Sequence, residues 1–502
     1  MGKGIKITFC CMGWENLGIE ALSAALKHAG HECRLAYDQA LFDDKNYLCI
    51  PWLAKLFDQK RKVIQRIINS RPDLVAFSCY TVNYPWALNM ARAIKEKLEV
   101  PIIFGNVHVS SVPEQVINED AIDMLCLWEG EEALVELANS MENGSVDHNI
   151  KNIWFKLEDR TIIRNDCRVP VKDLDILPHP DKELFEKEIP IKNYYLAALD
   201  RGCVYACNYC AVSVAAREYT IMGGKRYREP SVDHTIRELK VMKERYNYDW
   251  IDFRHSVFSA STKWVIDFCE RYVKEINVPF RIFYHPKLVN DETVRALKGA
   301  GCFAVQMGLE SFDEHLRSEI LNRKETNEQI VKAVNIMEEH KLKYSLDYIL
   351  GLPGQVEKEL EEAAKFFVEL RHCFRISSFM FQYLPKTKMV DIGVSLGLLS
   401  NKDVADIESG RHGNYMSDGS QADTATYKMF FAWKIFFRML PYLPIWMKKT
   451  ILKYKLYKIF KYLPQNLFIK MLDLVIVIRD IDARTYVKNY IWWALRRLRS
   501  DY

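Results

Sequence analysis

The strongest constraint on the fold is an alternation of short apolar segments with amphipathic segments, which occurs twice along the chain. One such series fills residues 1–150, and a second begins at Tyr194. Short apolar strands that alternate with helices are typical of parallel sheets covered on both faces. The pattern therefore predicts an α/β protein that contains two successive parallel sheets.

The first series predicts a doubly wound parallel sheet. Its expected strands are Ile5–Cys10, Glu32–Tyr37, Leu74–Cys79, Pro101–Phe104 and Asp123–Leu127. Asn16 is expected to cap the first helix. Sheets of this kind bind ligands beyond the carboxyl ends of their strands. We expect four segments to share that edge and to form one site: Cys11–Asn16, Tyr80–Asn83, Gly105–Ser111 and Trp128–Glu131.

The second series predicts a (β/α) barrel or partial barrel. Its expected strands are Tyr195–Ala198, Trp250–Phe253, Phe280–Tyr284, Ala304–Gly308, Ser345–Ile349 and Ile376–Tyr383. A hairpin is expected within a connector between the two series, at Ile153–Leu157 and Thr161–Asn165. The predicted domains are 1–150, the connector 151–193, the barrel 194–395 and a helical C-terminal segment 396–502.

The C-terminal part of the chain differs chemically from the rest. Residues 427–502 contain 16 Lys or Arg and 4 Asp or Glu, whereas the whole chain has a net charge of +4. Basic helices rich in aromatic residues can lie on an anionic bilayer surface. A helical lid that packs its aromatic side chains on the barrel fits the same pattern. Both interpretations stay open and both can hold at once, whereas nucleic acid binding is not expected.

Cysteine usage favours a reducing compartment. The 13 cysteines are spread over 502 residues, and several stand inside apolar strand-like runs, so they do not form a disulfide framework. Met1–Gly4 leads directly into the first expected strand without a signal-peptide core. We therefore expect a cytoplasmic protein, with peripheral contact to the inner membrane face as the further expectation from its basic C-terminal segment.

Three cysteines form the motif that carries the chemistry. Cys203, Cys207 and Cys210 follow an expected strand in the spacing C-x3-C-x2-C. A structural zinc site normally takes four protein ligands, and no fourth Cys or His lies nearby in sequence. Three cysteines can instead hold a 4Fe–4S cluster and leave one iron open for another ligand. An open iron at the edge of a barrel suits the reductive cleavage of S-adenosylmethionine (SAM).

With this motif, the chain resembles radical SAM enzymes. Further similarity lies in Gln306–Ser311, in Leu321–Arg323 and in Asp347–Gly354, which resemble the G-x-E-S strand end and the D-x-x-x-G-L-P-G segment of that family. The resemblance implies that SAM is bound by Tyr209, Glu310, Ser311, Arg323 and Asp347.

Within that set, the resemblance assigns Glu310 and Arg323 to the methionine end of SAM and Asp347 to its ribose. The chemistry agrees, because a guanidinium suits a carboxylate and a carboxylate suits an ammonium group or a diol. The alternatives are an exposed helix-end charge for Arg323 and a strand-end cap for Asp347.

His255 marks a departure from the family pattern. The segment Asp252–Phe258 replaces the paired acidic residues that are usual there. His255 is therefore a candidate proton donor or substrate contact, and a strand-end histidine hydrogen-bonded to the backbone is the alternative.

The first sheet resembles the cobalamin-binding domain that precedes the barrel in one large radical SAM subfamily. The similarity lies in Glu15–Ile19, Pro72–Val75, Gly105–Glu114 and Glu129–Glu132, and the two resemblances together cover about residues 1–395. They imply that cobalamin is bound by Asn16, Leu17, Gly18, Tyr80, Gly105, His108, Ser110, Glu129 and Gly130.

Several of these residues have physical properties that suit cobalamin binding. Gly105 and Gly130 would allow close backbone approach to a flat macrocycle, and Ser110 could donate a hydrogen bond to it. His108 either contacts the corrin edge or braces its own loop. The chain lacks a D-x-H-x-x-G segment, so no histidine of that motif would bind cobalt. A nucleotide-type fold without a cofactor is the alternative.

These features imply an enzyme that uses a 5′-deoxyadenosyl radical to abstract hydrogen from an unactivated carbon. With cobalamin, the expected outcome is methyl transfer from methylcobalamin to that carbon of a small-molecule or lipid-like substrate. Cyclisation or rearrangement is the alternative within the same family. A non-catalytic iron–sulfur or corrinoid sensor is less expected, because a sensor needs no SAM-binding residues. The resemblance also implies an electron donor such as flavodoxin or ferredoxin.

Overall fold

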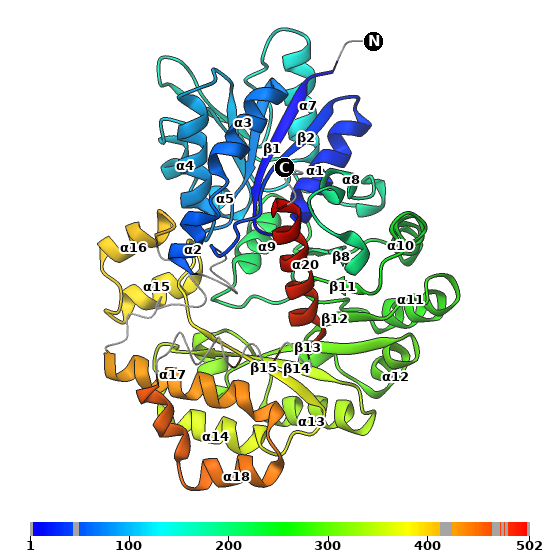
Figure 1. Cartoon of the computed structure of the whole chain (residues 1–502), viewed down its shortest axis with the longest axis vertical. Helices are drawn as coiled ribbons and strands as arrows, with labels where there is room; N and C mark the ends of the chain where they lie inside the picture. The colour runs from blue at the N-terminus through cyan, green and yellow to red at the C-terminus, as the bar shows by residue number, and fades with distance from the viewer. Residues whose placement is uncertain are drawn as a thin grey trace. The chain divides into compact units, whose positions relative to one another are not determined.

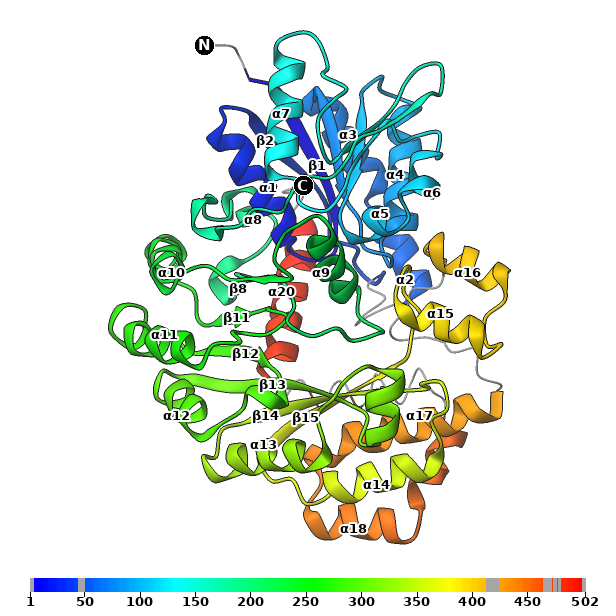
Figure 2. The same ribbon diagram turned by 180° about the vertical axis from the view of Figure 1, so that it is seen from behind.

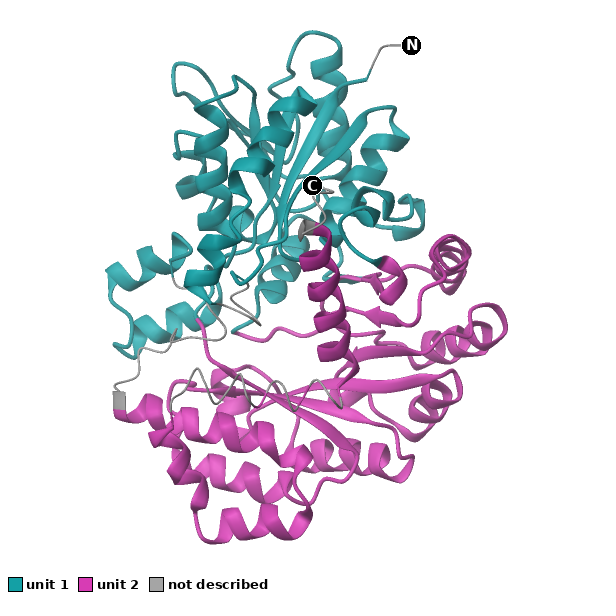
Figure 3. Cartoon of the chain, viewed as in Figure 1, with its two compact units in different colours: residues 1–190, 209–228, 383–414 teal, residues 191–208, 229–382, 415–502 magenta. Residues whose placement is uncertain are grey.

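The computed structural model describes residues 4–43, 50–411, 424–463 and 480–498, together with residues 472 and 476. The chain forms two compact units (Figure 3). Unit 1 comprises residues 1–190, 209–228 and 383–414, and unit 2 comprises residues 191–208, 229–382 and 415–502.

Unit 1 contains the predicted parallel sheet. Its strand order is β2-β1-β3-β4-β5-β6-β7, and its first five strands run parallel. These strands are β1 (Lys6–Met12), β2 (Glu32–Asp38), β3 (Leu74–Ser78), β4 (Ile102–Gly105) and β5 (Met124–Cys126). The order reverses at β1, which lies between β2 and β3. Ligand sites of doubly wound sheets lie at such a reversal.

Helices connect these strands, and the first is capped as predicted. Asn16 Oδ1 accepts a hydrogen bond of 3.1 Å from the Ile19 N–H at the start of α1. The helices of unit 1 before the cysteine motif are α1 (Leu17–His28), α2 (Pro51–Leu56), α3 (Lys60–Ser70), α4 (Tyr84–Lys95), α5 (Val107–Ser111), α6 (Pro113–Ile117), α7 (Glu131–Glu142) and α8 (Glu183–Glu186). The expected loop at 105–111 is therefore largely helical.

The predicted hairpin forms, but it belongs to the first sheet and not to a separate connector. β6 (Ile153–Lys156) pairs antiparallel with β5, and β7 (Ile162–Arg164) pairs antiparallel with β6. The hairpin thereby covers the edge of β5, whose backbone groups would otherwise be unpaired there. Residues 151–164 thus complete the first sheet.

Unit 2 contains the second predicted sheet as a partial barrel. Its six strands follow the order β15-β14-β13-β12-β11-β8, and all neighbours run parallel. The strands are β8 (Tyr195–Ala197), β11 (Ile251–Phe253), β12 (Phe280–Tyr284), β13 (Cys302–Glu310), β14 (Tyr344–Leu350) and β15 (Cys373–Met380). The helices between them are α10 (Val232–Tyr246), α11 (Thr262–Glu275), α12 (Asp291–Gly299), α13 (Asn327–Glu339) and α14 (Glu357–Phe367).

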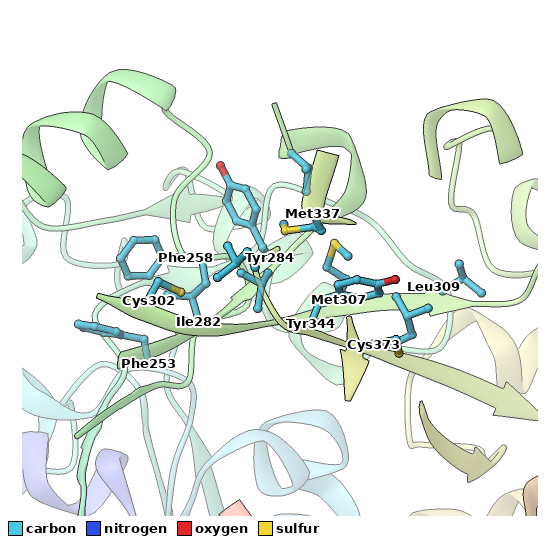
Figure 4. Packing of buried hydrophobic residues seen from close by; sticks show 14 of the residues in the cluster. Phe253, Phe258, Ile282, Tyr284, Cys302, Met307, Leu309, Met337, Tyr344 and Cys373 are labelled. Atoms are coloured by element: carbon cyan, nitrogen blue, oxygen red, sulfur yellow. The ribbon is translucent and has the colours of Figure 1, made fainter. Parts of the chain in front are cut away.

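The core of unit 2 lies between the outer face of this sheet and the helices. Phe253, Ile282, Met307 and Tyr344 are buried in one apolar cluster (Figure 4). Successive side chains of a strand point to opposite faces, so the residues beside these four face the inside of the partial barrel. The inner positions are polar, and Arg281 on β12 is an example.

Helix α17 (Thr424–Met439) packs its aromatic side chains into this core. The Trp433 ring lies 4.0 Å from the ring of Tyr457, which belongs to the short helix η6 (Leu456–Tyr462). Phe437 contacts Tyr348 of β14. The packed-lid interpretation is confirmed for these residues. Other parts of the basic segment, 464–471, 473–475, 477–479 and 499–502, lie outside the described residues.

Helix α20 (Ile481–Leu498) takes a different position from α17. It runs along the inner side of the sheet, beside β8, β11 and β12, whereas α10 and α11 lie on the outer side (Figures 1 and 2). The Asn193 side-chain amide donates to Asn489 Oδ1 over 2.7 Å and fixes α20 near the start of β8. Within the described part of the chain, no helix is long and apolar enough to cross a membrane.

Candidate active site

The three motif cysteines directly follow β9 (Arg201–Gly202), a two-residue strand that comes after β8 in the chain. Cys203 is half-buried and Cys207 is buried, and Cys210 is the N-terminal capping residue of α9 (Ala211–Ile221). The Tyr205 N–H donates to Cys203 Sγ over 3.4 Å. A helix N-terminus favours a thiolate, as does an N–H donor. Both features place positive partial charge beside the sulfur atoms of Cys203 and Cys210.

Hydrogen bonds join the loop of Cys203 and Cys207 to the predicted SAM-binding segment after β13. The Asn208 N–H donates to the Leu321 carbonyl over 3.0 Å, and the Asn208 amide donates to the Ile320 carbonyl over 2.8 Å. In return, the Asn322 amide donates to the Ala206 carbonyl over 2.8 Å. The loop of Cys203 and Cys207 and the segment that contains Arg323 are therefore held against each other.

Glu310 and Arg323, predicted to bind the methionine end of SAM, come together in unit 2. Glu310 Oε1 lies 3.6 Å from Arg323 Nη1. Arg323 is only 6% exposed, so it is not the exposed helix-end charge of the alternative interpretation. Glu310 has a backbone φ of +66°, which is unfavourable for a residue other than glycine and is characteristic of functional sites.

Arg323 has further partners, and the sequence analysis missed one of them, His285. His285 Nε2 lies 3.0 Å from Arg323 Nη2, and the His285 ring stacks on Tyr205 of the cysteine loop at 3.7 Å between centroids. Burial lowers the pKa of His285 to about 2, so the neutral imidazole accepts the hydrogen bond from the guanidinium. The position of His285 directly after a strand was the only sequence signal for it.

Ser311 and Asp347 occupy different environments from each other. Ser311 is fully buried, and its hydroxyl donates to Glu359, so in this structure it braces the chain behind Glu310. Asp347 stands within β14 and not at its end, which argues against a strand-end cap. It accepts bonds of 2.9 and 2.8 Å from the Gln306 amide, and burial is the main cause that raises its pKa.

A chain of polar contacts connects Asp347 with α20. Gln306 Oε1 accepts a bond of 3.1 Å from Arg375 Nη2, and Arg375 Nη1 lies 2.7 Å from Asp480. Asp482 forms ion pairs with both Arg375 and Arg281. The predicted ribose-binding carboxylate is therefore linked to the C-terminal helix through the inside of the barrel.

The surroundings of His255 fit the alternative interpretation, a strand-end histidine that is hydrogen-bonded to the backbone. It is buried, and its Nε2 accepts a bond of 3.0 Å from the Leu199 N–H. Burial lowers its pKa to about 3, so the imidazole is neutral near pH 7. Its part in catalysis stays a prediction.

In unit 1, the predicted segments meet at the carboxyl edge of the first sheet. Ser78 Oγ at the end of β3 lies 3.2 Å from the Asn16 amide and 2.8 Å from the Asn106 amide. The Trp128 N–H donates to Ser110 Oγ over 2.8 Å. The four segments therefore share one edge, as predicted. Leu17 and Gly18 begin α1 at this edge, the former half-buried and the latter exposed.

His108 lies inside unit 1 and braces a neighbouring loop. It is 1% exposed, its Nδ1 lies 3.2 Å from Thr81 Oγ1, and its ring packs on Tyr84 at 4.3 Å between centroids. Burial lowers its pKa to about 4. These contacts favour the bracing interpretation. Tyr80, in the loop that His108 braces, is exposed.

Two of the three predicted glycines, Gly105 and Gly130, have a packing role in this structure. A Cβ atom at Gly130 would lie 2.9 Å from Cys126 Sγ, and one at Gly105 would lie 3.2 Å from the Cys126 carbonyl oxygen. Asn106, where the family usually has glycine, has φ +83° and ψ −179°, a backbone conformation that glycine adopts readily and that is strained for asparagine. Internal packing thus already requires glycine at 130.

Glu129 is held by an internal ion pair. Glu129 Oε1 lies 2.5 Å from Arg228 Nη2, and Glu129 Oε2 accepts a bond of 3.0 Å from the Val171 N–H. The Arg228 guanidinium also lies over the Tyr219 ring at 4.9 Å. Glu129 therefore fixes the segment after the first sheet and the end of the α9 region within unit 1.

Comparison with known protein families decides the identity of the two units. Residues 199–367 match the model of the radical SAM superfamily, and residues 12–138 match that of the B12 binding domain. The chain is a radical SAM enzyme with an N-terminal B12-binding domain. Its predicted cofactors, a 4Fe–4S cluster, SAM and cobalamin, are those of these two domains.

Solved structures show the fold of this radical SAM enzyme. OxsB with aqua-cobalamin bound matches with a TM-score of 0.66 and 15% identity over 99% of this chain and 76% of its own. TsrM from Kitasatospora setae, with cobalamin and a 4Fe–4S cluster bound, matches with a TM-score of 0.62 and 16% identity over 79% of this chain and 75% of its own.

Three curated relatives are similar to this chain at low identity. The uncharacterised methyltransferase PH0819 of Pyrococcus horikoshii is 24% identical over 76% of this chain and 79% of its own length. The anaerobic magnesium-protoporphyrin IX monomethyl ester cyclase of Rubrivivax gelatinosus is 24% identical over 61% of this chain. The hopanoid C-3 methylase of Methylococcus capsulatus is 24% identical over 46%. The chain spans 55% and 41% of the length of the last two.

The residues present fit the expected groups chemically. Cysteine thiolates suit iron, and a buried Arg–Glu pair suits an amino acid carboxylate and ammonium. No group of three or more His, Cys, Asp or Glu among the described residues is arranged to hold a metal ion. The assignment of Cys203, Cys207 and Cys210 as cluster ligands therefore rests on their spacing and their place in the radical SAM domain.

Proposed function

We propose that this radical SAM enzyme transfers a methyl group to an unactivated carbon of a small-molecule or lipid-like substrate. Two of the relatives above are named as methyltransferase or methylase, and the solved TsrM structure is titled a radical SAM methyltransferase. When bound, the cluster, SAM and cobalamin supply the electron, the radical and the methyl group for this reaction. The residues of the chain bind and orient these groups.

The contact between Glu310 and Arg323 carries the proposal. Arg323 binds the carboxylate of SAM in our proposal, and Glu310 binds its ammonium group. The carboxylate and the ammonium group of an amino acid are attached to the same carbon atom. Two side chains that lie 3.6 Å apart can therefore bind one of these groups each. Hydrogen bonds fix the neighbouring cysteine loop to the same segment. Asp347, on the inner face of β14, binds the ribose.

Cobalamin binds, in our proposal, at the carboxyl edge of the first sheet. Asn16, Ser78 and Asn106 gather there at the strand-order reversal, where doubly wound sheets hold their ligands. Tyr80 and Gly18 are exposed at the segments that border this edge. These residues would supply hydrogen-bonding groups and a ring surface to a bound corrin.

Ring formation is the second candidate, because the magnesium-protoporphyrin ester cyclase is among the relatives. It uses the same SAM-binding residues and differs in the fate of the substrate carbon. The sensor interpretation is not retained for a radical SAM enzyme. An electron donor such as flavodoxin or ferredoxin and a cytoplasmic location belong to the proposal, since the cluster must be reduced before SAM is cleaved.

The test is label transfer under anaerobic conditions. The reconstituted full chain is incubated with a reductant, cobalamin, an extract of the source cells and SAM deuterated in its methyl group. We expect a product that carries the whole labelled methyl group and whose yield at limiting SAM falls with Glu310→Gln. A product that has lost hydrogen and carries no label would favour ring formation. Label transfer that does not require cobalamin would contradict the proposal.

A further inference from the structure

The segment α18 (Ile445–Lys453) to η6 divides its aromatic and apolar side chains between two faces. Tyr457 is 1% exposed and packs with Trp433 in the core. Five other large side chains of the segment point outward, with exposed fractions of 66% for Trp446, 64% for Tyr454, 42% for Leu456, 58% for Ile459 and 78% for Tyr462. The outward residues are thus not needed to fill the core.

The local helix geometry aligns these outward residues. η6 is a 3-10 helix with about three residues per turn, so Leu456, Ile459 and Tyr462 form one stripe along its surface. In the α-helix α18, Trp446 and Lys453 are seven residues apart and share one face, which continues to Tyr454. The segment therefore has an apolar outer surface, which we call the outer stripe: Trp446, Tyr454, Leu456, Ile459 and Tyr462.

The charge around the outer stripe is positive. Residues 441–463 contain six lysines and no acidic residue. Three of these lysines, Lys449, Lys455 and Lys458, form ion pairs with glutamates in or near α14. Two further lysines, one exposed and one half-buried, stand beside rings of the outer stripe: Lys453 lies over Tyr454 at 5.4 Å, and Lys461 lies over Tyr462 at 4.9 Å. Positive charge therefore flanks the exposed rings directly.

We propose that the outer stripe docks this enzyme on an anionic lipid bilayer. Tryptophan and tyrosine prefer the interface between water and acyl chains, and lysines beside them meet anionic headgroups. A second copy of the chain fits less well, because symmetric pairing of this surface would bring Lys453 and Lys461 against their own counterparts. The inference rests on exposure and charge and is independent of the reaction proposed above.

The test is co-sedimentation of the full chain with phosphatidylcholine vesicles that contain or lack phosphatidylserine. We expect salt-sensitive binding that requires phosphatidylserine. Trp446→Ala should weaken it about tenfold, since it removes a large side chain from the interface. The matched control is Trp52→Ala, because Trp52 is 70% exposed but lies on α2 in unit 1. This control should bind as the unchanged protein does.

Lys453→Gln combined with Lys461→Gln tests the electrostatic contribution to binding of the anionic bilayer. A lysine near an anionic leaflet contributes about fivefold in binding, so the pair of changes should weaken binding to phosphatidylserine vesicles by more than tenfold. Exchange of two exposed lysines elsewhere, Lys97→Gln with Lys343→Gln, is the control. Equal effects of Trp446→Ala and Trp52→Ala, or no lipid binding at all, would overturn the proposal. Self-association that Trp446→Ala abolishes would assign the outer stripe to a second copy instead and would also overturn it.

Discussion

Arg375 at the start of β15 and Asp480 directly before α20 form an ion pair with 2.7 Å between Nη1 and Oδ2, although 105 residues separate them in the sequence. Asp480 is almost fully buried. Asp482 adds a second carboxylate, which pairs with Arg375 and with the buried Arg281. The C-terminal helix thus supplies two negative charges to the polar inner face of the barrel.

Loss of these charges should destabilise unit 2. Asp480→Asn combined with Asp482→Asn removes two carboxylates that pair with Arg375 and removes the Asp482 carboxylate from the buried Arg281. Removal of one partner from a buried pair costs about 3–5 kcal/mol. Urea unfolding should show a loss in this range.

The control is Glu362→Gln, which removes an exposed ion pair with Lys365. Such pairs contribute less than about 1 kcal/mol, so its unfolding curve should barely move. If the Asp480/Asp482 variant also unfolded as the unchanged protein does, α20 would not be bound inside the barrel.

The cluster assignment predicts a sharp division among the cysteines. Triple Cys203/Cys207/Cys210→Ala protein should lose the iron and the brown absorption band after anaerobic reconstitution. Cys269→Ala should keep both, because Cys269 is buried in the apolar core of unit 2 and not in the motif. Iron and acid-labile sulfide analysis measures the difference. Full iron content in the triple variant would refute the assignment.

Glu310 offers the cleanest test of SAM binding. Arg323→Ala is less suitable, because Arg323 also pairs with the buried Glu325 at 2.5 Å and its loss would disturb folding. Glu310→Gln removes one charge at a less buried position. Loss of a charge-assisted bond of about 1.5–3 kcal/mol should weaken SAM binding by about ten- to a hundredfold.

Isothermal titration with SAM measures this change. Glu328→Gln is the control, since Glu328 is an exposed carboxylate in the first turn of α13. Its SAM affinity should equal that of the unchanged enzyme. Equal affinity in Glu310→Gln would remove Glu310 from the SAM site.

The buried His255 predicts a pH dependence of stability. Its pKa is about 3 in the folded protein, below the value of about 6.5 expected when unfolded. The unfolded chain therefore binds one more proton between these values, and the free energy of unfolding falls as the pH falls through this window. The slope from one proton is about 1.4 kcal/mol per pH unit.

His255→Gln should remove the contribution of His255 to the pH dependence of the free energy of unfolding. The measurement is urea unfolding at several pH values between about 4 and 7, with both proteins compared. Parallel pH profiles for the two proteins would show that His255 is not held neutral by burial. A role of His255 as an acid in catalysis would then regain support.

The sequence predicted the strands of both sheets to within about three residues, because the alternation of apolar segments and helices is local. It placed the hairpin correctly but not its partner β5, since strand pairing depends on contacts distant in the chain. The inner position of α20 was not predictable either, because the carboxylates of Asp480 and Asp482 find their partners on β12 and β15.

The sequence predicted only part of the candidate site, because some of its contacts join segments that are distant in the chain. The spacing of Cys203, Cys207 and Cys210 and the pair of Glu310 and Arg323 were visible as motifs. His285 was not, because its contacts with Tyr205 and Arg323 bring together three segments that follow no shared pattern. Gly130 was assigned to a ligand because its packing against Cys126 is visible only in the folded structure.

The most direct test of the account is cofactor analysis of the anaerobically reconstituted full chain, with iron, acid-labile sulfide, cobalamin and SAM cleavage measured on the same sample. We predict one 4Fe–4S cluster and one cobalamin per chain, and consumption of SAM once a reductant is added. The triple cysteine variant should retain cobalamin but lose the cluster and the cleavage of SAM. A reconstituted chain that holds no iron, or that keeps no cobalamin through gel filtration, would contradict the account.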